Sequence, residues 1–517
     1  MVGLLSLGTV DDQILAHDII THDPPYTFYR NYALQAFSAV ATGRNRFLIQ
    51  SRIGNGKTIF LRQISLDFAR SGYRVFAARH TTPDYQAEIE VLSKIPGKKL
   101  FIFDGYRDFE NLMKATAAYV SGVDVLVAAV RTSEVRNQIS DPSTALGGPF
   151  TRVNLDSLTD IEISGLESAI SYYGLWGSSA GATSPARRAF IRDKCDRELR
   201  SVILHLFEKT PLGDRVKAAF GDLRQGADDA LLAFTGSLLA RLADCPIDFF
   251  DVCELLQADH FDTRERLRSS GAGEFFHIAD DDFRARSSVL ADFALSQIID
   301  PETCLTALSQ MVESLTQLYG ADERYEDSVP RLLRFSVLGR VFKGSKRRDF
   351  IIKFYEGMLG IGKVRKNPQF WVQYAMARME RAEYPLAEKC FENAYTEARK
   401  MIRYNSYMID NQYIKFLLMS RIQDDRYTDA ADALSKAVPL IRRQIELMQH
   451  SADIHVLRPA EPMKQFQVRF GADLNQQSKA SLTGVMEAMR DRVLAISSEG
   501  RLDDDEKRYF HMLGSRS

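Results

Sequence analysis

Gly56-Lys57-Thr58 is the part of this chain whose residue types and spacing best fit a specific chemistry. It follows the apolar segment 47–50 and a turn that contains Gly54, and it begins an amphipathic pattern over 59–70. A strand, a glycine-bearing turn and a helix in this order are typical of a phosphate-binding P-loop, because backbone N–H groups and the positive helix N-terminus surround a triphosphate. The predicted nucleotide-binding residues are Gly54, Asn55, Gly56, Lys57 and Thr58.

Single positions of this loop have separate predicted roles. Lys57 reaches the β- and γ-phosphate oxygens, and the hydroxyl of Thr58 binds Mg²⁺. Ser51 stands where the usual pattern has its first glycine, and Gly54 supplies the flexibility because glycine adopts positive φ without steric cost. The alternative is an ordinary glycine turn that caps a helix, which the flanking strand and helix disfavour.

A carboxylate ends another apolar segment, where residues 100–103 are followed by Asp104. A buried strand of this kind places its aspartate beside the P-loop, where it holds Mg²⁺ through water, so Thr58 and Asp104 are the predicted metal ligands. Asp104 could instead cap the next turn. Gly105 follows it, where many hydrolysing relatives carry a glutamate that activates water, and Asp108 is not favoured as a substitute. Nucleotide binding is therefore better supported than fast hydrolysis.

The apolar segment 125–130 ends in Arg131-Thr132-Ser133. A cation at such a strand tip can face the γ-phosphate and report its presence, and Arg131 fits this role. The alternative, a solvated arginine at a strand end, has equal weight. With Lys57 and Asp104, Arg131 completes the predicted catalytic set.

These residues need a scaffold that brings strand ends together. Strand and helix patterns alternate along the chain, which predicts a parallel α/β domain of three layers. The expected strands are 47–50, 74–78, 100–103 and 125–130, and the expected helices are 59–70, 83–93 and 108–121.

The P-loop, the strand that ends in Asp104 without a following glutamate, and the Arg-Thr-Ser tip together resemble the STAND class of signalling P-loop ATPases. The resemblance covers about residues 25–295 and includes 152–162, which is similar to the link from the last core strand into a helical subdomain. The aromatic segment 24–30 resembles one that lies over the nucleotide base, although core packing is slightly favoured. The resemblance implies ATP and Mg²⁺ as cofactors, and ATP-dependent switching with oligomerisation between a sensor and an effector.

The middle of the chain reads mainly as helices, with two loops expected at 140–148 and 174–185, which are rich in glycine and other small residues. A hairpin predicted at 275–278 and 283–286 precedes a helix at 288–299 and resembles the winged-helix subdomain of STAND proteins. Arg286-Ser287 stands where that family often has a histidine on the β-phosphate. Since no basic cluster marks a recognition helix, DNA binding by this region is not favoured.

From residue 300 onward the chain reads as repeated helices, which predicts an α-solenoid. Aromatic and small residues recur at the spacing of tetratricopeptide repeats, although a generic stack of helical hairpins is physically almost the same object. Such stacks present a surface for protein ligands. The first copy is Trp371, Tyr374, Ala375, Tyr384, Ala387, Phe391 and Ala394, and the second is Leu417, Tyr427, Ala430, Leu434 and Ala437.

Composition narrows the function classes. The 517 residues include 67 Lys+Arg and 68 Asp+Glu, so no global basic field points to nucleic acid. The five cysteines lack C-x-x-C spacing, and no apolar run approaches the roughly 20 residues that span a bilayer, so we expect a cytoplasmic protein without a membrane segment. The predicted domains are a lead-in segment at 1–30, the P-loop core at 31–158, a helical subdomain at 159–240, a winged-helix-like subdomain at 241–299 and helical repeats at 300–517.

The leading hypothesis is an ATP-binding switch that senses a protein ligand through its repeats, hydrolyses ATP slowly and assembles into a homo-oligomer. The resemblance implies a role in bacterial defence against phage or a similar signalling role. Residues 1–24 are too few for an effector domain, so an effector on another chain is expected. The alternatives are a transcriptional regulator of the same ATPase class and a non-enzymatic scaffold with a structural nucleotide pocket.

Overall fold

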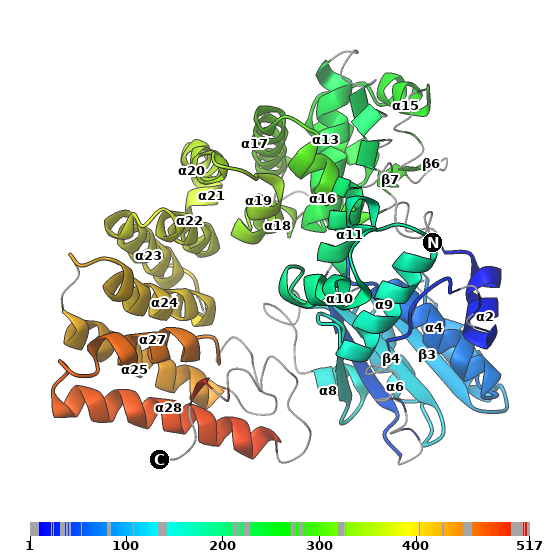
Figure 1. Cartoon of the computed structure of the whole chain (residues 1–517), viewed down its shortest axis with the longest axis horizontal. Helices are drawn as coiled ribbons and strands as arrows, with labels where there is room; N and C mark the ends of the chain where they lie inside the picture. Colours follow the sequence, from blue (N-terminus) through cyan, green and yellow to red (C-terminus); the bar gives the residue numbers. More distant parts are fainter. Residues whose placement is uncertain are drawn as a thin grey trace. The chain divides into compact units, whose positions relative to one another are not determined.

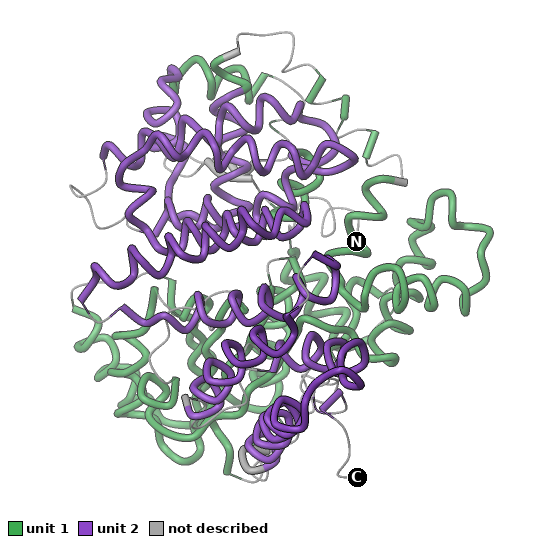
Figure 2. The backbone as a smooth tube through the Cα atoms, turned by 90° about the vertical axis from the view of Figure 1, so that its left-hand side faces the viewer, with its two compact units in different colours: residues 1–231, 260–294 green, residues 232–259, 295–517 purple. Residues whose placement is uncertain are grey.

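The computed structural model describes residues 10–21, 23, 25–30, 37, 40, 43–52, 54–79, 84–106, 108–132, 142–209, 213–214, 217–218, 220–221, 228–269, 273, 276–278, 283–285, 287–318, 325, 327–402, 404–426, 429–447, 457–497, 510 and 512–513. The chain divides into two compact units (Figure 2). Unit 1 comprises residues 1–231 and 260–294, and unit 2 comprises 232–259 and 295–517.

Unit 1 contains a parallel five-stranded sheet in the order β2-β3-β4-β1-β5. Strands β3 and β4 of this sheet are labelled in Figure 1. Parallel pairing brings the carboxyl ends of all five strands to one edge, where the predicted site residues lie. The four expected strands are confirmed. The strands are β1 (Arg46–Ser51), β2 (Arg74–Ala77), β3 (Lys99–Asp104), β4 (Val125–Arg131) and β5 (Thr151–Asn154).

Alternate residues of each strand face opposite sides of the sheet, and apolar clusters cover both sides. Phe47 and Ile49 of β1 face the helix α4 (Lys57–Arg70), which contributes Phe60 and Ile64. Leu48 faces the other side, in a cluster with Met113 of α6 (Glu110–Ala117) and Leu146 of α8 (Pro142–Leu146). Helix α5 (Tyr85–Lys94) adds Leu92 to this second cluster. The predicted three-layer α/β core is therefore confirmed.

Helix α6 ends at Ala117 rather than at residue 121, because a side chain offers the backbone another partner. Asp124 accepts hydrogen bonds from the N–H and hydroxyl of Ser121, at 3.0 and 2.6 Å, and from the N–H of Lys99 at 2.9 Å. Such local side-chain bonds compete with helix continuation.

The loop expected at 140–148 is wrong for residues 142–146, which form the helix α8. Its Ala145 and Leu146 are fully buried in the second cluster, so tertiary packing outweighs the loop-like composition. Residues 140 and 141 lie outside the described part of the chain.

The rest of unit 1 is mostly helical. Tyr26 of the aromatic segment is buried against Leu15 and Ile19 of α2, so it belongs to the core. The predicted hairpin is confirmed as an antiparallel pair of strands, whereas Arg286 lies outside the described residues. These elements are α2 (Asp12–Thr21), α9 (Asp160–Tyr172), the short 3₁₀ helix η2 (Gly177–Ser179), α10 (Ser184–Asp193), α11 (Leu199–Lys209), α15 (His260–Ser269), β6 (Phe276–Ile278) and β7 (Phe283–Ala285).

Helices α13 (Asp228–Ala243) and α16 (Ser288–Gln297) cross the boundaries between the units. In its described residues unit 2 is helical throughout, as predicted for the C-terminal region. Its remaining helices are α14 (Phe249–Leu255), α17 (Pro301–Leu318), α18 (Ser328–Leu332), α19 (Phe335–Val341), α20 (Arg347–Met358), α21 (Gly362–Arg365), α22 (Pro368–Glu380), α23 (Tyr384–Arg399), α24 (Tyr407–Gln423), α25 (Ala430–Leu447), α27 (Ala460–Phe470) and α28 (Gln476–Ser497).

The clearest repeat of unit 2 is a helical hairpin made by α22 and α23, which pack along each other and on α24 (Figure 1). Ala375, Ala387 and Ala394 are fully buried in this hairpin, and small residues of this kind let helices approach closely. In the second copy Leu434 and Ala437 are buried, whereas Tyr427 lies outside the described residues. The turn between α22 and α23 places Ala382 at a φ of 57°.

No helix within the described ranges is both long and apolar enough to cross a membrane. None of the five cysteines, all of which the structure describes, forms a disulfide, and Cys245 is the one that is not buried. The Cys245 thiol donates a hydrogen bond to the carbonyl of Ser328 at 3.6 Å. Burial raises the pKa of each of the other four thiols to about 12; these are Cys195, Cys253, Cys304 and Cys390.

We expect the thiols to react unequally with a disulfide reagent. At pH 8 a thiol with a pKa of about 12 is ionised in about one molecule in ten thousand, and only the thiolate attacks. Native protein should therefore show one fast thiol, Cys245, and Cys245→Ser should abolish that phase. In denaturant all five cysteines should react. A fast phase that survives Cys245→Ser would contradict the burial of the other four.

Candidate functional site

The turn between β1 and α4 has the backbone that a phosphate-binding loop requires. Gly54 and Gly56 have φ angles of 93° and 82°, which only glycine adopts without strain. Gly56 is the N-cap of α4, and no side chain caps that helix end within the part of the chain that the structure describes. The first N–H groups of a helix lack intrahelical partners, so this end suits an anion. Ile53 lies outside the described residues.

Ser51 does not need to be glycine. It is the last residue of β1 and pairs in register with Arg131, so its backbone is extended, a conformation that any residue adopts. Its hydroxyl donates to the carbonyl oxygen of Arg52 at 2.9 Å. The departure from the usual glycine pattern is therefore compatible with the loop.

Lys57, Thr58 and Asp104 converge although 46 residues separate Thr58 from Asp104. The ammonium of Lys57 lies 2.7 Å from Oδ1 of Asp104, and the hydroxyl of Thr58 donates to Oδ2 at 3.1 Å. The hydroxyl of Thr58 and the carboxylate of Asp104 make an oxygen donor set that fits Mg²⁺, a hard ion that prefers oxygen ligands. The Lys57 ammonium beside Asp104 shows that this point accepts a positive charge. These residues also fit the phosphates of a nucleotide, since the Lys57 ammonium stands at the uncapped end of α4.

The turn is held by the carboxylate of Asp156, which is 8% exposed. It accepts hydrogen bonds from the backbone N–H of Arg52 and, at 2.7 Å, from the hydroxyl of Thr132. The amide of Asn55 donates to it at 3.4 Å, and Arg52 adds an ion pair at 3.6 Å. Asp156 therefore joins the end of β4, the segment after β5 and the P-loop turn.

Sequence reasoning missed the role of Asp156. The only signal was a carboxylate directly after an apolar residue in the link 152–162, which is weaker than the four apolar residues that precede Asp104. Of the strand tip Arg131-Thr132, the structure gives Thr132 a defined contact, whereas the nucleotide-sensing role of Arg131 stays a prediction. Arg131 lies in register with Ser51, at the end of the strand next to the P-loop strand.

Asn55 uses its side chain for structure. Besides its bond to Asp156, its Oδ1 accepts the backbone N–H of Arg200 at 3.2 Å, and the residue is 1% exposed. Its backbone carbonyl accepts from Arg30, which also donates to the carbonyl of Leu155 at 2.7 Å. Its backbone N–H donates to the carbonyl of Arg52 at 3.4 Å, so the role of Asn55 in nucleotide binding stays a prediction.

Arg30 is a buried cation below this turn. Its guanidinium lies 3.4 Å from the carboxylate of Glu162, which also forms a capping box with Thr159 at the start of α9. Burial lowers the pKa of Arg30, and the charges of Glu162 and Asp156 oppose that shift. The pair connects the P-loop turn to the helical part of unit 1.

Helices α11 and α16 lie against the two glycines. A Cβ at Gly54 would lie 2.9 Å from Val289 and 3.0 Å from Arg200, and one at Gly56 would lie 3.3 Å from Leu199. Arg200 forms an ion pair with Asp292 of α16, whose side chain is buried. Ser287 caps α16, since its hydroxyl accepts the backbone N–H of Val289 at 3.2 Å.

Gly105, where hydrolysing relatives carry glutamate, has a φ of 143°. A Cβ at this position would lie 2.9 Å from Oδ2 of Asp108. The Asp108 carboxylate therefore occupies the space beside Gly105, next to Asp104.

We expect Asp156→Ala to destabilise unit 1, because the Arg52 N–H and the Thr132 hydroxyl lose a buried acceptor. The cost should be about 2–3 kcal/mol, measured from urea unfolding. Asp160→Ala is the matched control: its carboxylate is 66% exposed and pairs with Arg192 and Arg197, so the cost should stay below about 1 kcal/mol. Equal costs for the two variants would contradict the role assigned to Asp156.

Comparison with known proteins gives no family assignment, since neither a family model nor a curated protein matches this chain. Among solved structures, one match is a STAND protein with a tetratricopeptide repeat sensor from Pyrococcus horikoshii. The two sequences are 12% identical, and the match covers 93% of this chain and 83% of the Pyrococcus chain, with a TM-score of 0.28.

Another match is the ORC1 protein of Aeropyrum pernix, solved in complex with DNA. The two sequences are 12% identical, and the match covers 57% of this chain and 96% of the ORC1 chain, with a TM-score of 0.27. The first of these two structures belongs to the class that the sequence motifs resemble. At these TM-scores neither similarity says what this chain binds or does.

Proposed function

We propose that this chain is an ATP-binding regulatory switch of the STAND type. The observation that carries the proposal is the convergence of Lys57, Thr58 and Asp104 at the uncapped N-terminus of α4. A lysine, a hydroxyl and a carboxylate with these spacings suit a nucleoside triphosphate with its metal ion.

In this proposal the backbone N–H groups of the turn and the ammonium of Lys57 hold the phosphates. Lys57 exchanges its ion pair with Asp104 for phosphate oxygens. Thr58 and Asp104 hold Mg²⁺, which when bound neutralises phosphate charge. Arg131 senses the γ-phosphate from the end of β4.

Slow rather than fast hydrolysis agrees with the residues beside Asp104. Gly105 has no side chain that could orient a water, and the nearby Asp108 carboxylate is shorter by one methylene than the usual glutamate. A long-lived ATP complex suits a switch, in which the bound state is the signal.

The contacts of the turn with α11 and α16 support coupling between nucleotide and helices. Val289 and Arg200 lie so close to Gly54 that a Cβ there would clash with both. Arg200 pairs with Asp292, so in this proposal a change at the turn acts on α16. Helix α16 runs across the boundary into unit 2, where the helical repeats would sense a protein ligand. ATP-bound chains would then assemble into a homo-oligomer and signal to an effector on another chain. The resemblance and the free cysteines favour the bacterial cytoplasm, with defence against phage as the setting.

Lys57→Ala should weaken ATP binding by at least about tenfold, because it removes the cation that faces the phosphates. The measurement is a titration with fluorescent ATP. The control is Lys114→Ala. Lys114 belongs to α6, not to the turn, and forms an ion pair with Glu110 at 2.7 Å. The ATP affinity of this variant should equal that of the parent. Unchanged ATP affinity in Lys57→Ala would refute the P-loop assignment.

Asp104→Asn should abolish the gain in ATP affinity that Mg²⁺ provides, since the variant lacks the carboxylate charge that holds the ion. Titrations with Mg²⁺ and with a chelator measure that gain. In Asp108→Asn the dependence on Mg²⁺ should persist. If Asp104→Asn keeps the full effect of Mg²⁺, the metal assignment is wrong.

A further inference from the structure

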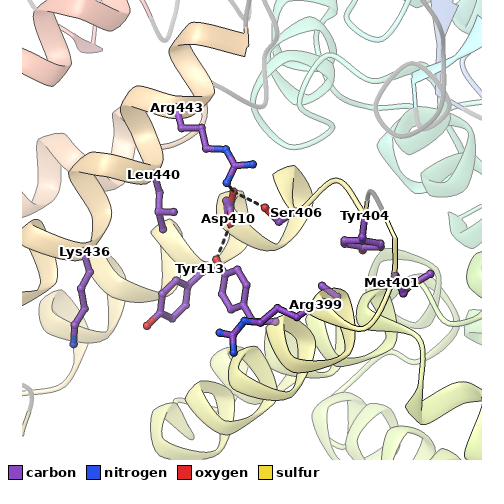
Figure 3. A pocket seen from close by; sticks show the side chains of 11 residues that line it. Arg399, Met401, Tyr404, Ser406, Asp410, Tyr413, Lys436, Leu440 and Arg443 are labelled. Carbon is purple, nitrogen blue, oxygen red and sulfur yellow. Dashed lines mark hydrogen bonds and ion pairs between the residues drawn. The ribbon is translucent and has the colours of Figure 1, made fainter.

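Unit 2 contains an open cavity of about 630 Å³ where α23, the start of α24 and α25 meet (Figure 3). It is far along the chain from the P-loop, and no step of the proposed nucleotide chemistry uses it. Its lining is mainly aromatic and cationic: Tyr395, Arg399, Tyr404, Tyr413, Lys436 and Arg443.

The floor of the cavity is a buried hydrogen-bond network around Asp410, which is 2% exposed. Its carboxylate accepts from the hydroxyls of Tyr395 at 2.8 Å and Ser406 at 3.1 Å, and Arg443 lies 3.7 Å away. Burial raises the pKa of Tyr395, so this phenol stays protonated and keeps donating. The negative charge of Asp410 is therefore neutralised within the wall.

The aromatic walls are also held in place. The hydroxyl of Tyr404 accepts from the Gln369 amide at 2.6 Å. The Tyr413 ring stacks on Phe416, with centroids 5.7 Å apart, and packs on Phe391 at 5.3 Å. A ligand would thus meet walls that are already ordered, which lowers the entropic cost of binding.

The charge of the lining is positive. The lining contains three cations, Arg399, Lys436 and Arg443, and one carboxylate, that of Asp410. Glu388 and Glu392 are not lining residues, although their charges act on Tyr413. Asp432 lies 2.7 Å from Lys436 and 3.8 Å from Arg421. Its one negative charge is shared between two cations, so the net charge of the lining stays positive. Arg399 is exposed and forms no ion pair with any residue in the described ranges. An anionic ligand is therefore complementary to this cavity.

Exposed apolar residues continue from the cavity along the chain. Met401 is 49% exposed and lines it, and Ile402, next along the chain, is 94% exposed. A small free anion would occupy only part of the cavity and leave Ile402 in water, whereas a peptide would cover both. Tyrosines beside cations also suit a peptide that carries carboxylates and an apolar or aromatic side chain.

We propose that this cavity is the docking site for an acidic peptide segment of a partner protein, with an apolar or aromatic side chain seated beside Met401. The inference deepens the proposed function, on which it rests for the idea that unit 2 senses a ligand. It assigns that ligand to the cavity of α23, α24 and α25.

The test is a display library of random peptides selected on the full chain without nucleotide. The selected sequences should be enriched in Asp and Glu next to an apolar or aromatic residue. A synthetic copy of the best peptide should lose about tenfold in affinity when the chain carries Arg399→Glu, because the charge reversal repels its carboxylates.

Lys366→Glu is the matched control, since Lys366 is also exposed but lies outside the cavity lining, and binding should change by less than about twofold. Met401→Ser should weaken binding without changing the net charge. Selection of peptides without acidic residues, failure to select any peptide, or equal binding by Arg399→Glu would overturn the proposal. Competition by millimolar inorganic phosphate at constant ionic strength would also overturn it, in favour of a small-anion site.

Repeating the measurement with Lys57→Ala separates this inference from the proposed function. Peptide binding should persist in that variant. The mass of the assembled protein should rise on adding both peptide and ATP, and this rise should occur only in the parent. If the peptide binds and the mass never changes, the docking site stands and the switch fails. If ATP binding responds to Lys57→Ala and no peptide is selected, the docking site fails alone.

Discussion

The buried carboxylate of Asp156 accepts hydrogen bonds from parts of the chain that meet only in the folded protein. It holds the Arg52 N–H, the Thr132 hydroxyl and the Asn55 amide at the edge of the sheet. A buried carboxylate is stable only when such donors surround it, so the same contacts that satisfy Asp156 also fix the turn that begins α4. With the turn fixed, Lys57 and Thr58 come to Asp104.

The same turn connects the sheet to the helices that follow it. A Cβ at Gly54 would clash with Val289 and Arg200, and one at Gly56 would lie tightly against Leu199, so these side chains lie close to the turn. The side chain of Asn55 faces Asp156 on one side and the backbone of Arg200 on the other. A phosphate that enters this turn therefore touches backbone already in contact with α11 and α16. Close packing transmits such displacements because packed side chains have few alternative arrangements.

The helical repeats of unit 2 are held together by the packing of small and aromatic side chains between helices. Alanines let α22 and α23 approach, and aromatic rings fill the space between successive helices, with Tyr384 and Phe391 both packing on Phe416. Where α23, the start of α24 and α25 meet, the space stays open, and tyrosines and charged side chains line it. The neutralised carboxylate of Asp410 leaves a surplus of positive charge there, and unlike the P-loop this chemistry has no local sequence motif.

Local patterns of the sequence were enough to predict the parallel α/β core, its first four strands, the strand–turn–helix around Gly56 and the position of Asp104 at the end of β3. Each depends on neighbouring residues: alternation and apolar runs make strands, and glycines at positive φ make the turn. They did not predict the helix at 142–146, whose composition resembles a loop but whose Ala145 and Leu146 are buried by the sheet. They also missed the end of α6, which depends on Asp124 in a later segment.

The roles of Asp156, Arg200 and the cavity around Asp410 were decided only by the tertiary structure. Asp156 and Arg52 are 104 positions apart, and Arg200 and Asp292 are 92 apart. No local periodicity encodes which buried acid meets which donor at such separations. The sequence by itself determined a strand, a turn and a helix that suit phosphate, because these depend on backbone geometry over a few residues. The folded chain decided what holds that turn and which helices touch it, because desolvated charges select their partners by proximity in space.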